Sequence, residues 1–301
     1  MTMNEAERGA NGNAEGLAVS FEFFPPKSDE QLPGLEKAAE RLARFRPQFV
    51  SMTYGAGGST RDRSFQAVRL IIEGTALPTA AHLTCVGQSR EHVAEVVARF
   101  RDLGVSHFVA LRGDSEGGLG EPYRPHPEGF QDTADLVAFL KEVPGTEVSV
   151  SGYPERHPQS ADWAEDLDVL KRKIDAGADR AITQLFFDND LFEAYLERVR
   201  AAGIAIPIVP GILPIHKFSA VQGFAGRCGA TIPERIARRF EGLETDMDAH
   251  RRTAVEVAAE QVIGLRQLGV DFFHFYTLNK GELVEATLES LGLRAAEKQA
   301  A

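Results

Sequence analysis

The 301-residue chain has little cysteine, no excess of basic charge and no long apolar run. Its two cysteines, Cys85 and Cys228, form neither a CxxC pair nor a zinc-type Cys/His spacing, so we expect neither a disulfide framework nor a metal centre. No apolar run approaches the ~20 residues that a bilayer requires, which excludes a membrane-spanning helix. With 33 basic against 44 acidic residues, the net charge of −11 argues against a nucleic-acid or anionic-membrane binder.

The remaining composition is that of an ordinary globular protein. Apolar residues make up 43% and charged residues 26%, which suffices for a substantial core. Unpaired cysteines suit a reduced, cytoplasmic compartment. The first residues are polar and lack the apolar region of a signal peptide. We expect a disordered lead-in at 1–17, a folded domain at 18–295 and a flexible tail at 296–301.

Short apolar runs of strand length alternate with amphipathic stretches along the chain. The runs are 19–24, 49–54, 80–86, 107–111, 147–153, 180–187, 205–209 and 272–277. Several lack polar alternation, as expected of parallel strands covered on both faces. Stretches such as 35–45, 91–103, 166–174 and 255–268 have apolar residues at helical spacing.

A repeated glycine turn supports a single architecture. Helices are expected to end at Gly104, Gly177, Gly203 and Gly269, each just before a strand, because glycine accepts the left-handed conformation that closes a helix. Repeated strand–helix units predict an α/β fold, a single-domain (β/α)₈ TIM barrel. The alternative, an open doubly wound sheet, is disfavoured because the glycines at 55–58 lack GxGxxG spacing. The long interval 209–272 should hold two or more helices.

The first run contains an acidic residue among aromatic ones. Period-two alternation places Ser20, Glu22 and Phe24 on one strand face and Phe21 and Phe23 on the other. The two phenylalanines can then pack against helices while Glu22 points into the barrel mouth. Apolar surroundings favour the protonated carboxyl and so suit a general acid, whereas a buried ion pair with Lys or Arg is the alternative interpretation.

Other candidate site residues fall at strand ends, where barrel active sites gather. They are Thr53, Tyr54, Ala56, His82, Leu111, Arg112, Gly113, Asp114, Tyr153, His157 and Gln184. Gly113, between Arg112 and Asp114, would allow a ligand to approach the backbone closely. A lone histidine is more often an ordinary hydrogen-bonded residue. The basic run 171–173 is more often a solvated helix face, and Phe224 more often core. Singly, none assigns a function.

Eight sequence segments, taken in order, carry a joint signal. They are SFEFFPPK (20–27), VSMTYGAGG (50–58), HLTC (82–85), VALRGD (109–114), GYPERHP (152–158), LKRKIDAGADRAITQLFFD (170–188), PGILPI (210–215) and HFYTLNK (274–280). Together, and in this order, they resemble the methylenetetrahydrofolate reductase family, and the resemblance extends from about residue 19 to about residue 293.

The resemblance implies a reaction and its cofactors. Non-covalent FAD would be reduced by NADH or NADPH and would then reduce 5,10-methylenetetrahydrofolate to 5-methyltetrahydrofolate, with ping-pong kinetics. NADH is the donor common in short members, and members form homo-oligomers. Glu22 matches the acid that protonates folate N10, and Asp114 the aspartate near pterin and flavin. Gln184 matches a pterin contact and Phe224 a stacking aromatic.

The resemblance also implies a set of cofactor contacts. For FAD these are Thr53, Tyr54, Ala56, His82, Leu111, Arg112, Gly113, Asp114, Tyr153, His157, Asp166 and Lys173. Arg112 and Lys173 would hold the diphosphate, and Asp166 the ribose or adenosine.

The chain departs from the family pattern at three positions. Phe130 stands where a tyrosine is common, Ala220 where some members have glutamine, and Lys280 where the family has an arginine for the folate tail. We expect altered folate affinity or tail preference from these changes. Two other functions stay open on the sequence: another flavin barrel of proline-dehydrogenase type, and a non-catalytic subunit that binds flavin or folate.

Overall fold

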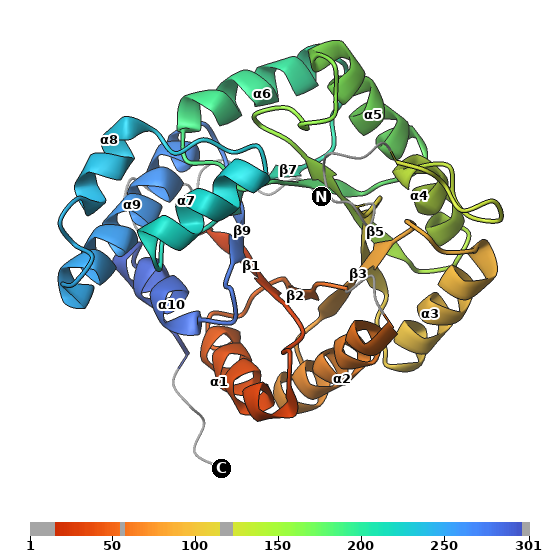
Figure 1. Cartoon of the computed structure of the whole chain (residues 1–301), viewed down its shortest axis with the longest axis horizontal. Coiled ribbons are helices and arrows are strands. Elements are labelled where there is room, and N and C mark those ends of the chain that lie inside the picture. The colour runs from red at the N-terminus through yellow and green to blue at the C-terminus, as the bar shows by residue number, and fades with distance from the viewer. Residues whose placement is uncertain (1–15, 55–57, 115–122, 297–301) are drawn as a thin grey trace.

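Parallel strands form a barrel enclosed by helices in the computed structural model of the chain (Figure 1). The structure describes residues 16–54, 58–114 and 123–296. Neighbouring strands follow the order β7-β6-β5-β4-β3-β2-β1-β9-β8, and every pairing is parallel. The strands are β1 (Ala18–Phe23), β2 (Phe49–Met52), β3 (Thr79–Thr84), β4 (His107–Leu111), β5 (Glu147–Gly152), β6 (Arg180–Thr183), β7 (Ile208–Val209), β8 (Gly211–Ile212) and β9 (Phe272–Tyr276).

One barrel position is divided in two at Pro210. β7 pairs with β6, whereas β8 pairs with β9. Proline has no N–H to donate to a strand ladder, but the Pro210 carbonyl oxygen accepts the N–H of His274 at 3.0 Å. β7 and β8 therefore complete the ring between β6 and β9, which confirms the expected (β/α)₈ barrel. The strand expected at 205–209 begins only at Ile208 and continues beyond the proline.

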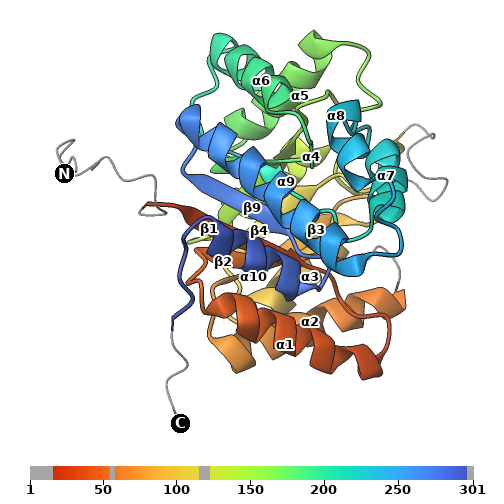
Figure 2. The same ribbon diagram turned by 90° about the vertical axis from the view of Figure 1, so that its left-hand side faces the viewer.

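Helices follow the strands around the outside of the barrel. They are α1 (Leu32–Ala43), α2 (Gly58–Thr75), α3 (Arg90–Asp102), α4 (Thr133–Lys141), α5 (Trp163–Asp175), α6 (Asn189–Ala201), α7 (Phe218–Arg227), α8 (Glu234–Ala237), α9 (Met247–Gln267) and α10 (Gly281–Ser290). Three helices, α7, α8 and α9, occupy the long interval 209–272, as expected. Figure 2 shows α7 at the end of the barrel opposite to the start of β1. No helix in these described ranges is long and apolar enough to cross a membrane.

The glycine turns have the predicted form. Gly104, Gly177, Gly203 and Gly269 have φ values of +88°, +110°, +78° and +84°. In each turn the next residue donates its N–H to a carbonyl in the last helical turn, as Val105 does to Phe100 at 3.0 Å. This bond satisfies a carbonyl that the helix end would leave unpaired. The repeated turn returns each chain segment to the start of a strand.

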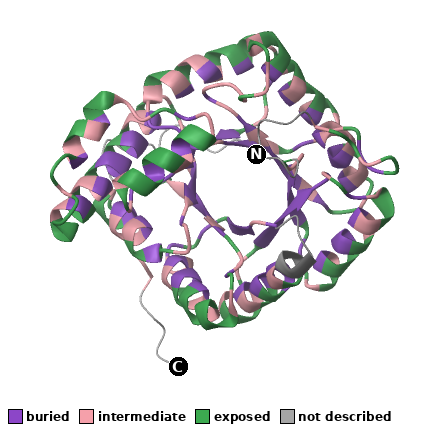
Figure 3. Ribbon diagram, viewed as in Figure 1, coloured by how far each residue is buried: buried purple, intermediate pink, exposed green. Residues whose placement is uncertain are grey.

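The core lies on both sides of the strands. Phe21 and Phe23 are fully buried between sheet and helices, as the alternation predicted, and burying a phenylalanine stabilises a fold by ~1.5–3 kcal/mol. Inside the barrel, a smaller apolar cluster contains Phe49, Val109 and Ile182. Figure 3 shows this arrangement, with buried strands at the centre and exposed residues on the outer helix faces. The barrel interior is therefore a packed layer that supports the groups above it.

The ends of the described chain join the folded body. Leu17 packs against the core, and the N–H of Ala296 donates to the carbonyl of Arg44 at 2.9 Å. The remainder of the expected lead-in and tail lies outside the described residues.

Candidate active site

Two adjoining cavities lie at the carboxyl ends of the strands. The first, here the mouth cavity, has a volume of about 430 Å³, and the second, here the side cavity, about 300 Å³. Leu111, Asp114, Ser151 and Tyr153 line both of them. Site residues expected from the sequence also line the mouth cavity: Glu22, Thr53, Tyr54, His82, Gln184 and Phe224. Others line the side cavity: Arg112, Gly113, His157, Asp166 and Lys173.

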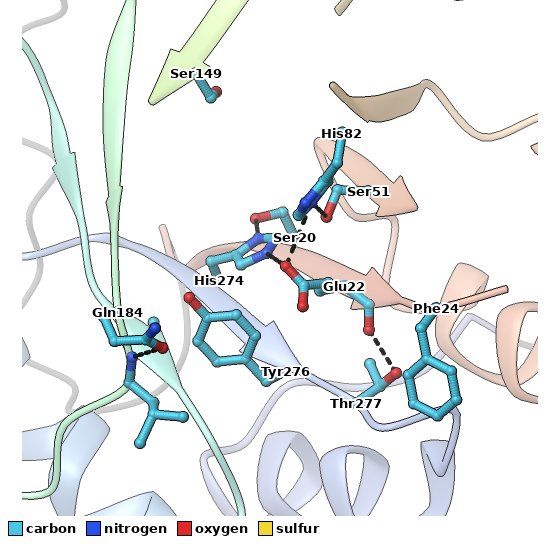
Figure 4. A network of polar contacts seen from close by, with 12 residues as sticks. Ser20, Glu22, Phe24, Ser51, His82, Ser149, Gln184, His274, Tyr276 and Thr277 are labelled. Atoms are coloured by element: carbon cyan, nitrogen blue, oxygen red, sulfur yellow. Dashed lines mark hydrogen bonds and ion pairs between the residues drawn. The ribbon is translucent and has the colours of Figure 1, made fainter. Parts of the chain in front are cut away.

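Glu22 projects from β1 into the mouth cavity, as the alternation predicted (Figure 4). Its side chain is 22% exposed, and its Oε2 lies 3.4 Å from His82 Nε2 and 3.8 Å from His274 Nε2. Thr277 Oγ1 donates to the Glu22 carbonyl oxygen at 2.6 Å and ties this end of β1 to the end of β9. Within the described chain, the carboxyl therefore faces two imidazoles, and not the Lys or Arg partner of the alternative interpretation.

The two imidazoles are held by serines on neighbouring strands. His82 Nε2 lies 3.2 Å from Ser51 Oγ, and His274 Nδ1 lies 2.7 Å from Ser20 Oγ. Burial lowers the pKa of His82 below its usual value. The nearby Glu22 carboxyl acts against this shift, and His274 adds to it. His82 is consequently neutral at neutral pH. The imidazole beside the Glu22 carboxyl is therefore uncharged.

The other wall of the mouth cavity carries amide and aromatic groups. The Gln184 side-chain oxygen accepts the N–H of Leu185 at 2.9 Å, which fixes the orientation of the amide (Figure 4). Tyr276 OH donates to the Thr183 carbonyl at 2.7 Å. Phe224 reaches this cavity from α7, and Asp114 stands exposed at the end of β4. The cavity thus combines an acid, a fixed amide and flat apolar surfaces, which suits a heteroaromatic ligand.

The side cavity contains a buried lysine. Lys173 is 5% exposed, and its Nζ donates to the Ser151 carbonyl at 3.1 Å. Burial lowers its pKa to about 8, although Asp166 opposes that shift. Asp166 accepts hydrogen bonds from the His157 N–H and from Ser160 Oγ, both at 2.9 Å, and so fixes the loop after β5.

A second cation faces the same cavity from the end of β4. Arg112 Nε donates to the Gly113 carbonyl at 3.3 Å, and its Nη2 donates to Gln159 Oε1. Its guanidinium lies 5.3 Å from the centre of the Tyr123 ring. Gly113 has φ +84°, and a Cβ there would stand 2.5 Å from Val86 Cγ1. A glycine is therefore required beside Arg112, because of its backbone conformation and its packing against Val86. The two cations of the side cavity, Arg112 and Lys173, suit a phosphate-bearing ligand.

Four residues singled out in the sequence lie outside the two cavities or outside the described residues. Ala56 lies outside the described residues. Lys280 is exposed at the start of α10, two positions after Leu278, and lines neither cavity among the described residues. Phe130 is fully buried, and the centre of its ring lies 4.5 Å from the Arg90 guanidinium. The position where the family commonly has a tyrosine is therefore part of the core. Ala220 is exposed on α7.

The sequence reasoning missed several groups of the site. His274, Ser20, Ser51 and Ser151 were not selected as site residues. One signal was available for His274, because it alternates with Phe273 and Phe275, which are fully buried. Period-two alternation therefore places it on the inner face, next to Glu22.

Comparison with known proteins gives the site a family context. The family model described as methylenetetrahydrofolate reductase matches residues 8–292. A 5,10-methylenetetrahydrofolate reductase of Pectobacterium carotovorum subsp. carotovorum is 42% identical over 280 residues, which cover 92% of this chain and 91% of that protein. The Escherichia coli K12 protein of the same name is 40% identical over 278 residues, with 92% of each chain covered.

A solved structure agrees in fold. It is a Clostridium thermocellum protein described as binding two copies of 5-methyl-5,6,7,8-tetrahydrofolic acid, with a TM-score of 0.62 at 14% identity, over 92% of this chain and 94% of that one. At this identity the likeness concerns the barrel alone. The family match and the two relatives establish membership: the chain belongs to the methylenetetrahydrofolate reductase family.

Proposed function

We propose that this protein reduces 5,10-methylenetetrahydrofolate to 5-methyltetrahydrofolate, with non-covalent FAD as the hydride carrier and a nicotinamide dinucleotide, preferably NADH, as the donor. Family membership supports the reduction of methylenetetrahydrofolate. The observation that carries the finer proposal is the arrangement of the two cavities. The Glu22 carboxyl faces the mouth cavity beside two imidazoles, and two cations line the side cavity that adjoins it.

The residues of the side cavity fit FAD. Arg112 and Lys173 supply the two positive charges that a diphosphate requires, and Gly113 lets the chain beside Arg112 pack against Val86, where a Cβ would stand 2.5 Å from that side chain. The Asp166 carboxylate on the same wall suits a ribose or adenosine contact. Thr53, Tyr54, His82 and Leu111 line the mouth cavity, which supports their assignment to the ring system.

Each part of the reaction then has its residues. The flavin supplies hydride transfer, which no protein side chain performs. Glu22 holds the proton that folate N10 needs before its ring opens, and His82 and His274 keep the carboxyl at the cavity wall. The Gln184 amide and Phe224 hold the pterin and the aromatic ring that follows it. Asp114, at the junction of the cavities, places a negative charge near a cationic folate.

Anaerobic absorbance spectroscopy of the FAD-loaded protein tests the proposal. We expect NADH to bleach the flavin spectrum and 5,10-methylenetetrahydrofolate to restore it, with NADPH acting more slowly. A flavin that the donor never bleaches would favour a non-catalytic binding subunit. A flavin that the donor bleaches and the folate never re-oxidises would favour a different flavin-dependent oxidoreductase.

The affinity for FAD should depend on pH through Lys173. Because its pKa is about 8 in the free protein, Lys173 is charged at pH 7 and mostly neutral at pH 9. A bound diphosphate favours the charged form, so FAD binding takes up a proton and weakens as pH rises through 8. We expect the dissociation constant, measured by flavin fluorescence, to rise about 10-fold between pH 7 and pH 9.

Two variants isolate this effect. Lys173→Met should bind FAD more weakly at pH 7 and lose the pH dependence. Lys171→Met is the matched control, because Lys171 is exposed on the same helix and paired with Asp175 at 3.0 Å. An equal pH dependence in the wild type and Lys173→Met would assign the titration to another group.

A further inference from the structure

We propose that Glu155 and Thr231 form a clamp that positions α7 over the mouth cavity and couples it to the loop of the side cavity. Glu155 Oε1 accepts the N–H of Thr231 at 2.9 Å, and its Oε2 accepts Thr231 Oγ1 at 2.6 Å. The two residues are 76 positions apart in the chain. The inference rests on the proposed function, because it assigns the two cavities to one cofactor and its substrate.

The first half of the clamp belongs to the loop between β5 and α5. Tyr153 and His157 of this loop line the side cavity, and Asp166 fixes its backbone. Arg156, between Glu155 and His157, has φ +67°. Such a conformation is costly for a residue with a Cβ and persists only where surrounding contacts maintain it. It allows Glu155 to reach Thr231 while His157, two positions later, remains at the cavity.

The second half belongs to the turn that ends α7. The N–H of Ala230 donates to the Ala225 carbonyl at 2.9 Å, so the turn is fixed to the last helical residues. Ala230 is buried in the same apolar cluster as Val221 and Ala225. A Cβ on Gly229 would come within 2.7 Å of Pro158 Cγ, so the turn also packs directly against the β5–α5 loop.

The clamp therefore connects the β5–α5 loop, which lines the side cavity, to α7, which lines the mouth cavity. Phe224 lines the mouth cavity from α7, and its carbonyl accepts the N–H of Cys228 at the end of that helix. Movement of the turn at Thr231 would move Phe224 relative to the groups around Glu22. A carboxylate with two hydrogen bonds is suited to this task, because charge-assisted bonds are shorter and stronger than neutral ones. Glu155 and Thr231 are positioning residues, since neither lines a cavity in the described part of the chain.

Steady-state kinetics of the FAD-loaded enzyme give the first test. In Glu155→Gln and Thr231→Val, we expect the KM for 5,10-methylenetetrahydrofolate to rise on the order of 5- to 10-fold with kcat changed less than about 2-fold, because the clamp orients a binding surface and not the reacting atoms. Thr231→Ser keeps the hydroxyl and should restore the wild-type KM. The double variant should lose no more than either single variant, as expected for two residues that form one interaction.

Hydrogen exchange supplies a readout that does not depend on turnover. In the wild type, we expect FAD to protect the backbone amides of 153–160 and also those of 218–231. In the clamp variants, FAD should still protect 153–160 but no longer protect 218–231. Asp179→Asn is the matched control: Asp179 accepts the Val148 N–H at 2.7 Å at the other end of the barrel, so its loss lowers stability without touching α7.

The outcomes separate the clamp from the proposed function. A wild-type flavin that the folate does not re-oxidise would contradict the proposed function. With re-oxidation present, an unchanged KM together with unchanged protection of 218–231 in Glu155→Gln and Thr231→Val would overturn the clamp. The clamp would also be overturned if Asp179→Asn raised the KM as much as Glu155→Gln and Thr231→Val do.

Discussion

Glu22→Gln is expected to slow folate reduction severely and to leave reduction of the flavin by NADH nearly unchanged. Glutamine preserves the shape of the side chain but has no proton of suitable acidity to give to folate N10. General acid catalysis contributes about 10²–10⁴-fold to a rate, so we expect the re-oxidation half-reaction to slow by about three orders of magnitude. Stopped-flow absorbance at the flavin band measures the two half-reactions separately.

A loss confined to the folate half-reaction would show that Glu22 acts on the folate and is not simply structural. FAD binding should persist in Glu22→Gln, because the cations that suit its diphosphate lie in the side cavity. Glu147→Gln is a suitable control, since Glu147 pairs with Arg180 and begins β5 at the opposite end of the barrel. If Glu22→Gln slowed both half-reactions equally, Glu22 would have a structural role.

The sequence predicted the barrel because its signals were local and repeated. Apolar runs, helical spacing and four glycine turns each depend on neighbours a few positions away. The same local rule, period-two alternation, placed Glu22 on the inner face of β1. The contacts between Glu22 and the two imidazoles could not be predicted in this way, although alternation places each histidine on a strand face. His82 and His274 lie on other strands, and their distances to the carboxyl depend on strand register, as in the pairing of Glu22 with Tyr276.

Lys173 shows that a run of basic residues does not by itself predict that every member is exposed. A basic run on a helix is usually solvated, and Lys171 and Arg172 are indeed exposed. Lys173 is instead buried with Asp166 and Leu170, because positions 166, 170 and 173 share one face of α5. That spacing was present in the sequence, but only the barrel brings this face against β5 and the Ser151 carbonyl.

Arg112→Ala is expected to weaken FAD binding by about 10- to 100-fold, which corresponds to the ~1.5–3 kcal/mol of a hydrogen bond to a charged group. Arg112 is held before any ligand binds, because its guanidinium donates to Gln159 and to the Gly113 carbonyl and lies over the Tyr123 ring. A group already in place loses little conformational entropy on binding, so most of its interaction contributes to affinity. Titration of FAD followed by fluorescence measures the change.

The matched control is another arginine stacked on an aromatic ring. The guanidinium of Arg198, on α6, lies 4.6 Å from the centre of the Trp163 ring, at the start of α5. This reproduces the stacking of Arg112, and Arg198 lines neither cavity among the described residues. Arg198→Ala should leave FAD affinity within about 2-fold of the wild type, while Arg112→Lys should give an intermediate loss, because an ammonium keeps the charge but not the fork of donors. Arg112 would be removed from the phosphate site if Arg112→Ala and Arg198→Ala bound FAD equally well. Lys173 would then be the principal cation of the side cavity, and the pH dependence of FAD binding should be undiminished in Arg112→Ala.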